Sequence, residues 1–265
     1  MNKSLVQSQF GPVAAKYAVS RVHAQGASLS RLVELVRPQS GWRALDIATA
    51  AGHTALALAP HVEHVTAADI TPQMLTVAQG LARERGIGNV SFEEADAENM
   101  PFAGGAFDLV TCRIAPHHFS NVPRFLSEVA RVLKPGGVFG LVDNIAPDAN
   151  TTSGDAAELA DAAEYFTAFE KLRDPSHVLC LSLAEWLRLT GAAGLAVQHH
   201  ELLDKPMAFE PWAEQMRSGA DNKAELERML LEAPPALREF LRPERRDGAL
   251  WFTVVEAVIV AGKPL

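Results

Sequence analysis

Between residues 42 and 145 the chain alternates short apolar runs with helix-like stretches, and this alternation restricts the fold more than any other feature. The runs at 42–49, 64–70, 89–96, 107–114 and 138–145 have the length and composition of strands. Helical patterns occupy 53–61, 71–86 and 122–133 between them. Such alternation is typical of a parallel sheet covered by helices on both faces, so we expect an α/β fold.

Turn and capping residues support these boundaries. Thr71 and Pro72 are suited to the N-cap and the first position of a helix that stops at Gly86. The helix at 122–133 is closed by the segment Lys134-Pro135-Gly136-Gly137, where proline and two glycines oppose continuation.

The remainder of the chain is less regular. We expect a long amphipathic helix at 153–174 and a second helix at 182–191, which opens with a capping box of Ser182 and Glu185. A strand is predicted at 195–202, short helices broken by prolines at 207–241, and a strong strand at 249–263. The predicted fold is Rossmann-like, with seven mostly parallel strands, an antiparallel last strand and a helical lid. Its expected parts are N-terminal lid helices (1–40), an α/β core (41–145), core completion with helical cap insertions (146–246) and a C-terminal strand of the same sheet (247–265), in a single domain.

The composition of the chain limits the classes of partner that it is expected to bind. The chain has 24 basic and 32 acidic residues, a net charge of −8, and no lysine or arginine run. Nucleic-acid binding, which needs a clustered basic face, is therefore not expected. No apolar stretch is long enough to span a membrane. Two cysteines are too few for a disulfide framework and fit a reducing cytoplasm.

The residues that follow the predicted strands indicate the ligand. Open α/β sheets bind ligands outside the carboxyl ends of their strands. The first strand leads into the small-residue turn 46–52, the second ends in Asp69, and the third ends in Asp96. An acid after the second strand is placed to accept hydrogen bonds from ribose hydroxyls. Asp96 could accept from an adenine amine beside Met74 or Met100, so the set predicts an adenosine site.

Five segments resemble the class I S-adenosylmethionine-dependent methyltransferases, particularly the ubiquinone/menaquinone C-methyltransferase-like (methyltransferase type 11) branch. They are LDIATAAGHT, AADIT followed by ML, ADAENMPFAGGAFDLV, CRIAPHHF and EVARVLKPGG, in order over residues 44 to 144. The resemblance implies S-adenosylmethionine as cofactor. In that family the acid after strand 2 holds the ribose, the Asp-Ala pair after strand 3 meets adenine, and the first loop passes the methionine moiety. The cofactor-binding residues carried over are Tyr17, Asp46, Ala48, Gly52, Asp69, Ile70, Met74, Asp96, Ala97, Arg113 and His118.

The first loop departs from the family pattern, because alanine stands at two positions usually taken by glycine. Alanine is tolerated at these positions if φ is negative, but it is costly if φ is positive. In the second case the alanines would weaken or abolish cofactor binding. A nicotinamide dinucleotide site is the competing interpretation of the turn. It is disfavoured because an acid precedes the turn and Gly52 is its only glycine, a poor host for two phosphates.

The catalytic candidates are His117, His118 and Asp143. The two histidines follow strand 4, where a neutral imidazole could take a proton from the methyl acceptor, and His117 is favoured. Asp143 ends strand 5 and could orient that histidine. The alternative for the histidines is a capping or packing role, and for Asp143 a turn. Asp143 and Asn144 also resemble the Asp-Asn pair of metal-dependent catechol-type enzymes, but Arg113 and the histidines replace the further acid there, so no metal is expected.

A small organic acceptor is predicted, either quinone-like or a secondary metabolite, methylated on oxygen, nitrogen or carbon. Aromatic and apolar residues of the expected lid suggest this, although they would serve equally as core. The alternative is a cofactor-binding protein of this fold with a non-methylating or regulatory role. The sequence leaves a monomer and a homodimer open. The substrate-binding candidates are Phe10, Tyr17, His23, His117, Asn144, Phe169, Arg173 and His177.

Overall fold

The computed structural model describes residues 3–15, 26–215 and 220–265, and it divides into two compact units. The first unit comprises Met1–Asp143, Leu187–Glu201 and Val258–Leu265, and the second comprises Asn144–Trp186 and Leu202–Ala257. Two of the predicted site residues, Tyr17 and His23, lie outside the described residues. The expected four-part division of a single domain stays a prediction.

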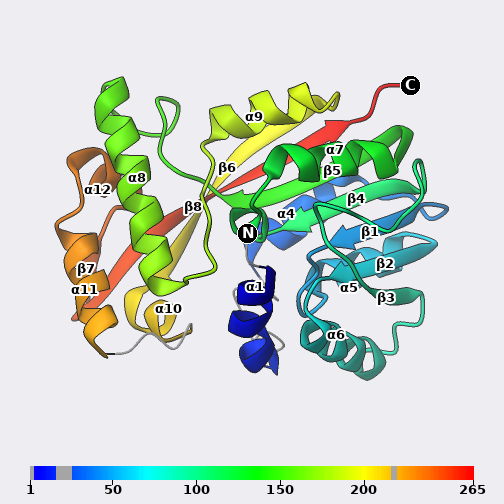
Figure 1. Cartoon of the computed structure of the whole chain (residues 1–265), viewed down its shortest axis with the longest axis horizontal. Coiled ribbons are helices and arrows are strands. Elements are labelled where there is room, and N and C mark those ends of the chain that lie inside the picture. Colours follow the sequence, from blue (N-terminus) through cyan, green and yellow to red (C-terminus); the bar gives the residue numbers. More distant parts are fainter. Residues whose placement is uncertain (1–2, 16–25, 216–219) are drawn as a thin grey trace. The chain divides into compact units, whose positions relative to one another are not determined.

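The described residues form one sheet of eight strands in the order β3-β2-β1-β4-β5-β8-β6, with β7 paired to β8 (Figure 1). β1 pairs in parallel with β2 and β4, β2 with β3, and β4 with β5. The predicted Rossmann-like, mostly parallel sheet is confirmed, and β7, which is antiparallel to β8, is an additional short strand. The strands are β1 (Arg43–Ile47), β2 (His64–Asp69), β3 (Val90–Glu94), β4 (Phe107–Arg113), β5 (Leu133–Asn144), β6 (Ala196–Ala208), β7 (Glu244–Arg246) and β8 (Ala249–Gly262).

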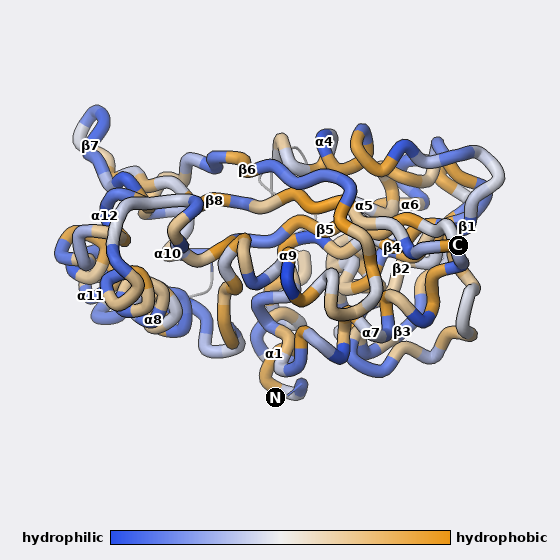
Figure 2. Tube along the Cα trace, turned by 90° about the horizontal axis from the view of Figure 1, so that it is seen from above, coloured by the Kyte–Doolittle hydropathy of each residue, from blue (hydrophilic) through white to orange (hydrophobic). Residues whose placement is uncertain are grey.

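Helices cover both faces of the sheet in the first unit. α4 (Ala27–Val36), α5 (His53–Leu58) and α6 (Pro72–Glu84) lie on one side, and α7 (Val122–Val132) lies on the other (Figure 2). α6 begins with Thr71 as N-cap and Pro72 in its first turn, as predicted. The sheet between these layers supplies the core, because most side chains of β1, β4 and β5 are fully buried.

The start of β5 corrects one expectation. The segment Lys134-Pro135-Gly136-Gly137 was expected to be a turn that separates α7 from a strand beginning at 138. Instead β5 begins at Leu133 and contains this segment as an irregularity. Leu133 is paired with Phe107, whereas Val138 is paired with Leu109, so the extra residues bulge out of the ladder. Gly136 takes a φ of 77°, which only glycine adopts easily.

The second unit combines helices with β7, residues 202–208 of β6 and residues 249–257 of β8. Asp155 and Glu158 form a capping box at the start of α8 (Ala156–Arg173). The predicted box is present at the start of α9 (Leu183–Ala192), a helix whose residues from Leu187 on belong to the first unit, with Ser182 N donating to Glu185 Oε2 at 2.9 Å and Glu185 N to Ser182 Oγ at 3.3 Å. The remaining helices are α10 (Phe209–Gln215), α11 (Ala220–Leu231) and α12 (Pro235–Leu241). Pro211 does not break α10 as expected, because it lies in the first turn, where its missing N–H is not needed.

Aromatic side chains build the core of the second unit. The rings of Phe169 and Trp212 stack with centroids 5.0 Å apart, and Phe252 packs edge-on against Trp212 at 5.0 Å. Such pairs stabilise beyond the area they bury. No helix among the described residues has both the length and the apolar character needed to cross a bilayer.

Candidate active site

The turn after β1 bends back sharply through residues in left-handed conformations. Ala48, Ala50 and Gly52 have φ values of 55°, 48° and 82°. The two alanines therefore occupy the conformation in which alanine is costly, about 1–2 kcal/mol per residue. Gly52 is required twice over, because a Cβ there would also lie 2.9 Å from the Cβ of Ala78 on α6. The backbone of this turn therefore has the left-handed conformations that usually require glycine, although two of the three positions are alanine.

The Asp46 carboxylate stabilises this turn by hydrogen bonds. Its Oδ2 accepts from Thr49 Oγ1 at 2.5 Å and from the Ala55 amide at 3.2 Å, and its Oδ1 accepts from Thr111 Oγ1 at 2.7 Å. Burial raises the pKa of Asp46 to about 6, against the hydrogen bonds from Thr49 and Thr111, which lower it. Both carboxylate oxygens thus serve the loop and β4.

Asp69, the expected ribose acid, also contacts the turn. Its Oδ2 accepts from the Ala50 amide at 2.8 Å and its Oδ1 from the Thr71 amide at 2.8 Å. Burial raises the pKa of Asp69, and these amides oppose the rise. The Thr71 side chain and the Ile70 amide also lower this pKa, and acceptance from a ribose diol stays a prediction.

Asp96, the expected adenine acid, follows β3. Its Oδ1 accepts from the Glu98 amide at 2.9 Å, and its Oδ2 forms an ion pair with the Lys3 ammonium of α1 (Lys3–Phe10). Ala97 beside it is buried, as is Met74 on α6. The carboxylates of Asp69 and Asp96 follow the paired strands β2 and β3, at the edge where a ligand is expected.

The N-terminal segment packs against the same edge. Gln7 Nε2 donates to the Ile70 carbonyl at 2.7 Å, and the rings of Phe10 and His118 meet edge-on at 5.0 Å. The 3-10 helix η1 (Gly11–Val13) follows, and Val13 and Ala14 form a buried cluster with Ala51 and Met74, against which Phe10 and Ala50 pack. The placement agrees with a lid on the cofactor side, which stays a prediction.

The end of β4 is strained. Ile114 has a φ of 54°, which is unusual for a β-branched residue, and its amide donates to the Val142 carbonyl at 2.7 Å. Strain of this kind clusters at functional sites. Arg113 beside it donates from Nε to Thr54 Oγ1 at 3.1 Å, and its charge lowers the pKa of Asp46. Arg113 therefore faces the start of α5 and the turn after β1.

His117 and Asp143 form a buried pair. His117 lies in the 3-10 helix η3 (Pro116–His118), and its Nδ1 is 2.6 Å from Asp143 Oδ1 near the end of β5. Within the described part of the chain, Asp143 Oδ2 has no hydrogen-bond partner. An ionised Asp143 fixes the proton on His117 Nδ1, which leaves Nε2 as the basic nitrogen. The role of His117 as a general base stays a prediction.

The other substrate candidates belong to the second unit. Phe169 is part of the aromatic core, and the Arg173 guanidinium lies 4.6 Å from the Trp212 ring centroid. His177 is buried with Nε2 3.8 Å from Cys180 Sγ. Asn144 ends β5 with a buried Oδ1 that accepts no hydrogen bond from the described residues. Their roles in binding substrate stay predictions.

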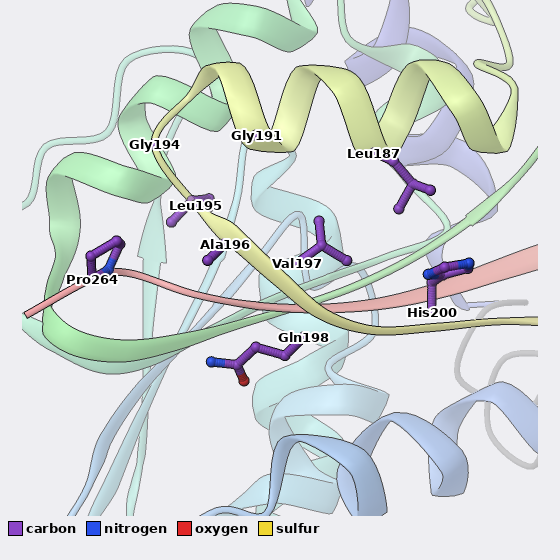
Figure 3. Close-up of a pocket in the computed structure, with 9 residues that line it drawn as sticks. All are labelled: Leu187, Gly191, Gly194, Leu195, Ala196, Val197, Gln198, His200 and Pro264. Atoms are coloured by element: carbon purple, nitrogen blue, oxygen red, sulfur yellow. The ribbon is translucent and has the colours of Figure 1, made fainter.

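A shallow pocket lies elsewhere, between the end of α9 and the edge strand β6 (Figure 3). None of the predicted site residues lines it. Its walls are Leu187, Gly191, Gly194, Leu195, Ala196, Val197, Gln198, His200 and Pro264. We therefore assign the chemistry to the strand ends rather than to this pocket.

Comparison with known proteins decides the family. Residues 45–141 match the family model described as a methyltransferase domain. The uncharacterized methyltransferase YcgJ of Bacillus subtilis strain 168 is 34% identical over 257 residues, which are 97% of this chain and 98% of that protein. The chain belongs to the class I S-adenosylmethionine-dependent methyltransferases. The predicted family, enzyme class and cofactor are thereby confirmed.

Two further similarities bear on this methyltransferase. The solved structure of the YcgJ protein has a TM-score of 0.81 with 34% identity, and the match covers 90% of this chain and 98% of that one. A demethylmenaquinone methyltransferase of Thermus thermophilus is 41% identical over 135 residues, 48% of this chain and 60% of that protein. The similarity to YcgJ thus covers both units, whereas the similarity to the menaquinone enzyme covers about half of the chain.

The residues of this methyltransferase fit the cofactor. Gly52 gives the turn its tight left-handed geometry, and the carboxylates of buried Asp69 and half-buried Asp96 lie at the end of β2 and after β3, where hydroxyl and amine donors of adenosine would be held. Among the described residues no three His, Cys, Asp or Glu side chains gather as a metal site.

Sequence reasoning missed several residues that contact the predicted site residues. Lys3 and Gln7 of α1 carry no motif, so only their contacts with Asp96 and Ile70 reveal them. Thr111 lies inside the predicted strand 107–114 and carries no motif, although its hydroxyl donates to Asp46, which also holds the loop. Glu98 was visible within the third matching segment, but no role was assigned to it.

Proposed function

We propose that this methyltransferase methylates a small organic molecule and that His117 takes the proton from the acceptor. The observation that carries the proposal is the contact of 2.6 Å between His117 Nδ1 and Asp143 Oδ1 near the ends of neighbouring strands. S-adenosylmethionine supplies an activated methyl group for an in-line displacement when it is bound.

The protein's own residues have three tasks in this scheme. Asp69 accepts from the ribose hydroxyls and Asp96 from the adenine amine, so that the cofactor is oriented by carboxylates at both ends of the adenosine. His117 Nε2 accepts the acceptor's proton, and the imidazolium is then stabilised by Asp143. Through its contact with His117 Nδ1, Asp143 also keeps the required tautomer of the imidazole.

The acceptor class rests on two supports. Relatives that match about half of this chain are named as quinone methyltransferases, among them the Thermus thermophilus enzyme. The second unit has a core of aromatic rings, which suits an apolar or aromatic partner as well as it suits packing. We therefore propose a quinone-like or secondary-metabolite acceptor methylated on carbon, oxygen or nitrogen.

The remaining partners are proposed from composition. A net charge of −8 without a basic cluster supports a small-molecule acceptor rather than nucleic acid. Two cysteines, too few for a disulfide framework, support a cytoplasmic location. A monomer and a homodimer both remain compatible with these observations.

The test is an acceptor panel with mass detection of products and measurement of turnover against pH. The panel contains hydroxylated naphthoquinols, phenols, amines, a nucleic acid and a protein. His117→Ala should lower kcat by about 10²–10⁴-fold with the verified acceptor. Asp143→Asn should lower kcat as well, and exposed His61→Ala should leave it unchanged.

Full turnover by His117→Ala would refute the base role. Methylation of the nucleic acid or the protein alone would refute the small-molecule acceptor. Binding of the cofactor without methyl transfer to any member would favour the non-methylating alternative.

A further inference from the structure

Glu98 has a buried carboxylate with three hydrogen-bond contacts, all supplied by the segment after the His117-His118 turn. Ser120 Oγ lies 2.8 Å from Oε1 and 3.0 Å from Oε2, and the Asn121 amide donates to Oε1 at 2.8 Å. Glu98 is only 7% exposed. A carboxylate this buried is costly unless it is hydrogen-bonded, so these contacts fix its position.

The main chain of Glu98 is fastened as firmly as its side chain. Its amide donates to Asp96 Oδ1 at 2.9 Å, and its carbonyl accepts from Arg124 Nε of α7 at 2.6 Å. The Lys3 ammonium of α1 lies 3.7 Å from Oε2. One residue thus joins the loop that carries Asp96 to α1, to α7 and to the segment after η3.

This connection has a consequence for the reacting groups. Asp96 is two residues before Glu98, and His118 is two residues before Ser120. His117 is held on its other side by Asp143. A displacement of the Glu98 carboxylate would therefore move the adenine acid and the histidine turn relative to each other, although Glu98 acts on both only through these intervening residues.

We propose that Glu98 is a positioning residue that couples the adenine end of the cofactor site to the His117-His118 turn. The inference rests on the proposed function, because it assigns the histidine turn to the reacting end of the site. It adds a residue to which no role had been given.

The test uses the full-length protein and S-adenosylhomocysteine, the demethylated product, as the probe. The imidazole resonances of His117 and His118 are assigned by NMR with His117→Gln and His118→Gln. Glu98→Gln keeps the shape of the side chain but removes the charge that strengthens its hydrogen bonds. It should shift both histidine resonances in the free protein and weaken binding of the probe about three- to tenfold.

Glu128→Gln is the matched control. Glu128 Oε2 accepts from the Met100 amide at 2.7 Å. This contact also anchors the loop after β3, but it connects that loop to α7 and not to the segment after η3. This variant should weaken binding of the probe without moving the resonances of His117 and His118. A merely structural role of Glu98 would give the two variants the same pattern.

Ser120→Ala tests the same contact independently, and it can replace Glu98→Gln if that variant fails to fold. It removes the hydroxyl from the other side of the same contact and should reproduce the histidine shifts. In the double variant with Glu98→Gln, the loss of affinity should be smaller than the product of the single losses. Independent effects in this cycle would overturn the inference.

The outcomes separate the inference from the proposed function. No binding of the probe to the wild-type protein would contradict the proposed site as a whole. Normal binding by the wild type, with histidine resonances unmoved in Glu98→Gln and in Ser120→Ala, would overturn the role of Glu98 alone.

Discussion

Replacing Ala48 by glycine is expected to stabilise the protein, although it deletes a methyl group. Ala48 has a φ of 55°, where an alanine costs about 1–2 kcal/mol relative to the right-handed conformation. Glycine relieves this strain, but it also gives the unfolded chain more conformational freedom, which lowers stability by about 0.5–1 kcal/mol. The net expectation is a gain of about 0.5–1 kcal/mol for Ala48→Gly.

Two neighbouring substitutions act as internal controls. Ala50 also has a positive φ, but its methyl packs on the cluster of Val13, Ala51 and Met74, and losing it costs up to about 0.8 kcal/mol. Ala50→Gly should therefore change stability by close to zero. Gly52→Ala should lose about 2 kcal/mol or more, because it adds both left-handed strain and the contact with Ala78.

The assay is urea unfolding at about 25 °C and neutral pH, with the midpoint and the slope fitted for each variant. The expected order of stability is Ala48→Gly above wild type, Ala50→Gly equal to wild type and Gly52→Ala lowest. A loss of about 1 kcal/mol or more in Ala48→Gly, at an unchanged slope, would refute the reasoning from backbone conformation.

Two further predictions concern the carboxylates of the site. Asp46 has a folded pKa of about 6 against an ordinary value of 3.8, so its protonated form is favoured in the folded state. The free energy of unfolding therefore falls as pH rises from about 4 to about 6, and the loss due to Asp46 is about 3 kcal/mol at most. Asp46→Asn should remove this part of the pH dependence in urea unfolding, and a parallel profile in the two proteins would contradict the assignment. Lys3→Met frees Asp96 Oδ2 and should tighten binding of S-adenosylhomocysteine about two- to fivefold, since the ion pair is partly exposed. Weaker binding by Lys3→Met in calorimetry would show that Lys3 supports the site instead of competing with adenine.

The alternating pattern of residues 42 to 145 predicted the sheet because a strand buried on both faces is almost continuously apolar. Thr71 and Pro72 placed the start of α6 because a cap and an N-terminal proline act locally. Asp46 near the end of β1, Asp69 at the end of β2 and Asp96 after β3 were chosen for a similar reason, since strand ends meet at one edge, and their roles stay predictions.

The features that the sequence did not predict have nonlocal causes. The bulged start of β5 depends on its register with β4, which the segment 134–137 does not encode alone. The fully engaged carboxylate of Asp46 depends on Thr111, 65 residues away. The backbone of Ala48 and Ala50 could not be inferred from residue type, because alanine normally avoids positive φ.

We propose that Asp69 at the end of β2 and Asp96 after β3 form the adenosine site of this methyltransferase. The most direct measurement is calorimetric titration of S-adenosylhomocysteine into the wild type, Asp69→Asn and Asp96→Asn, with Asp108→Asn as the control. Asp108 pairs with Lys134 and lies outside the predicted site. The wild type and Asp108→Asn are expected to bind with similar affinity, and Kd is expected to rise about tenfold or more in each of the other two variants. Unchanged affinity in both Asp69→Asn and Asp96→Asn would contradict this proposal.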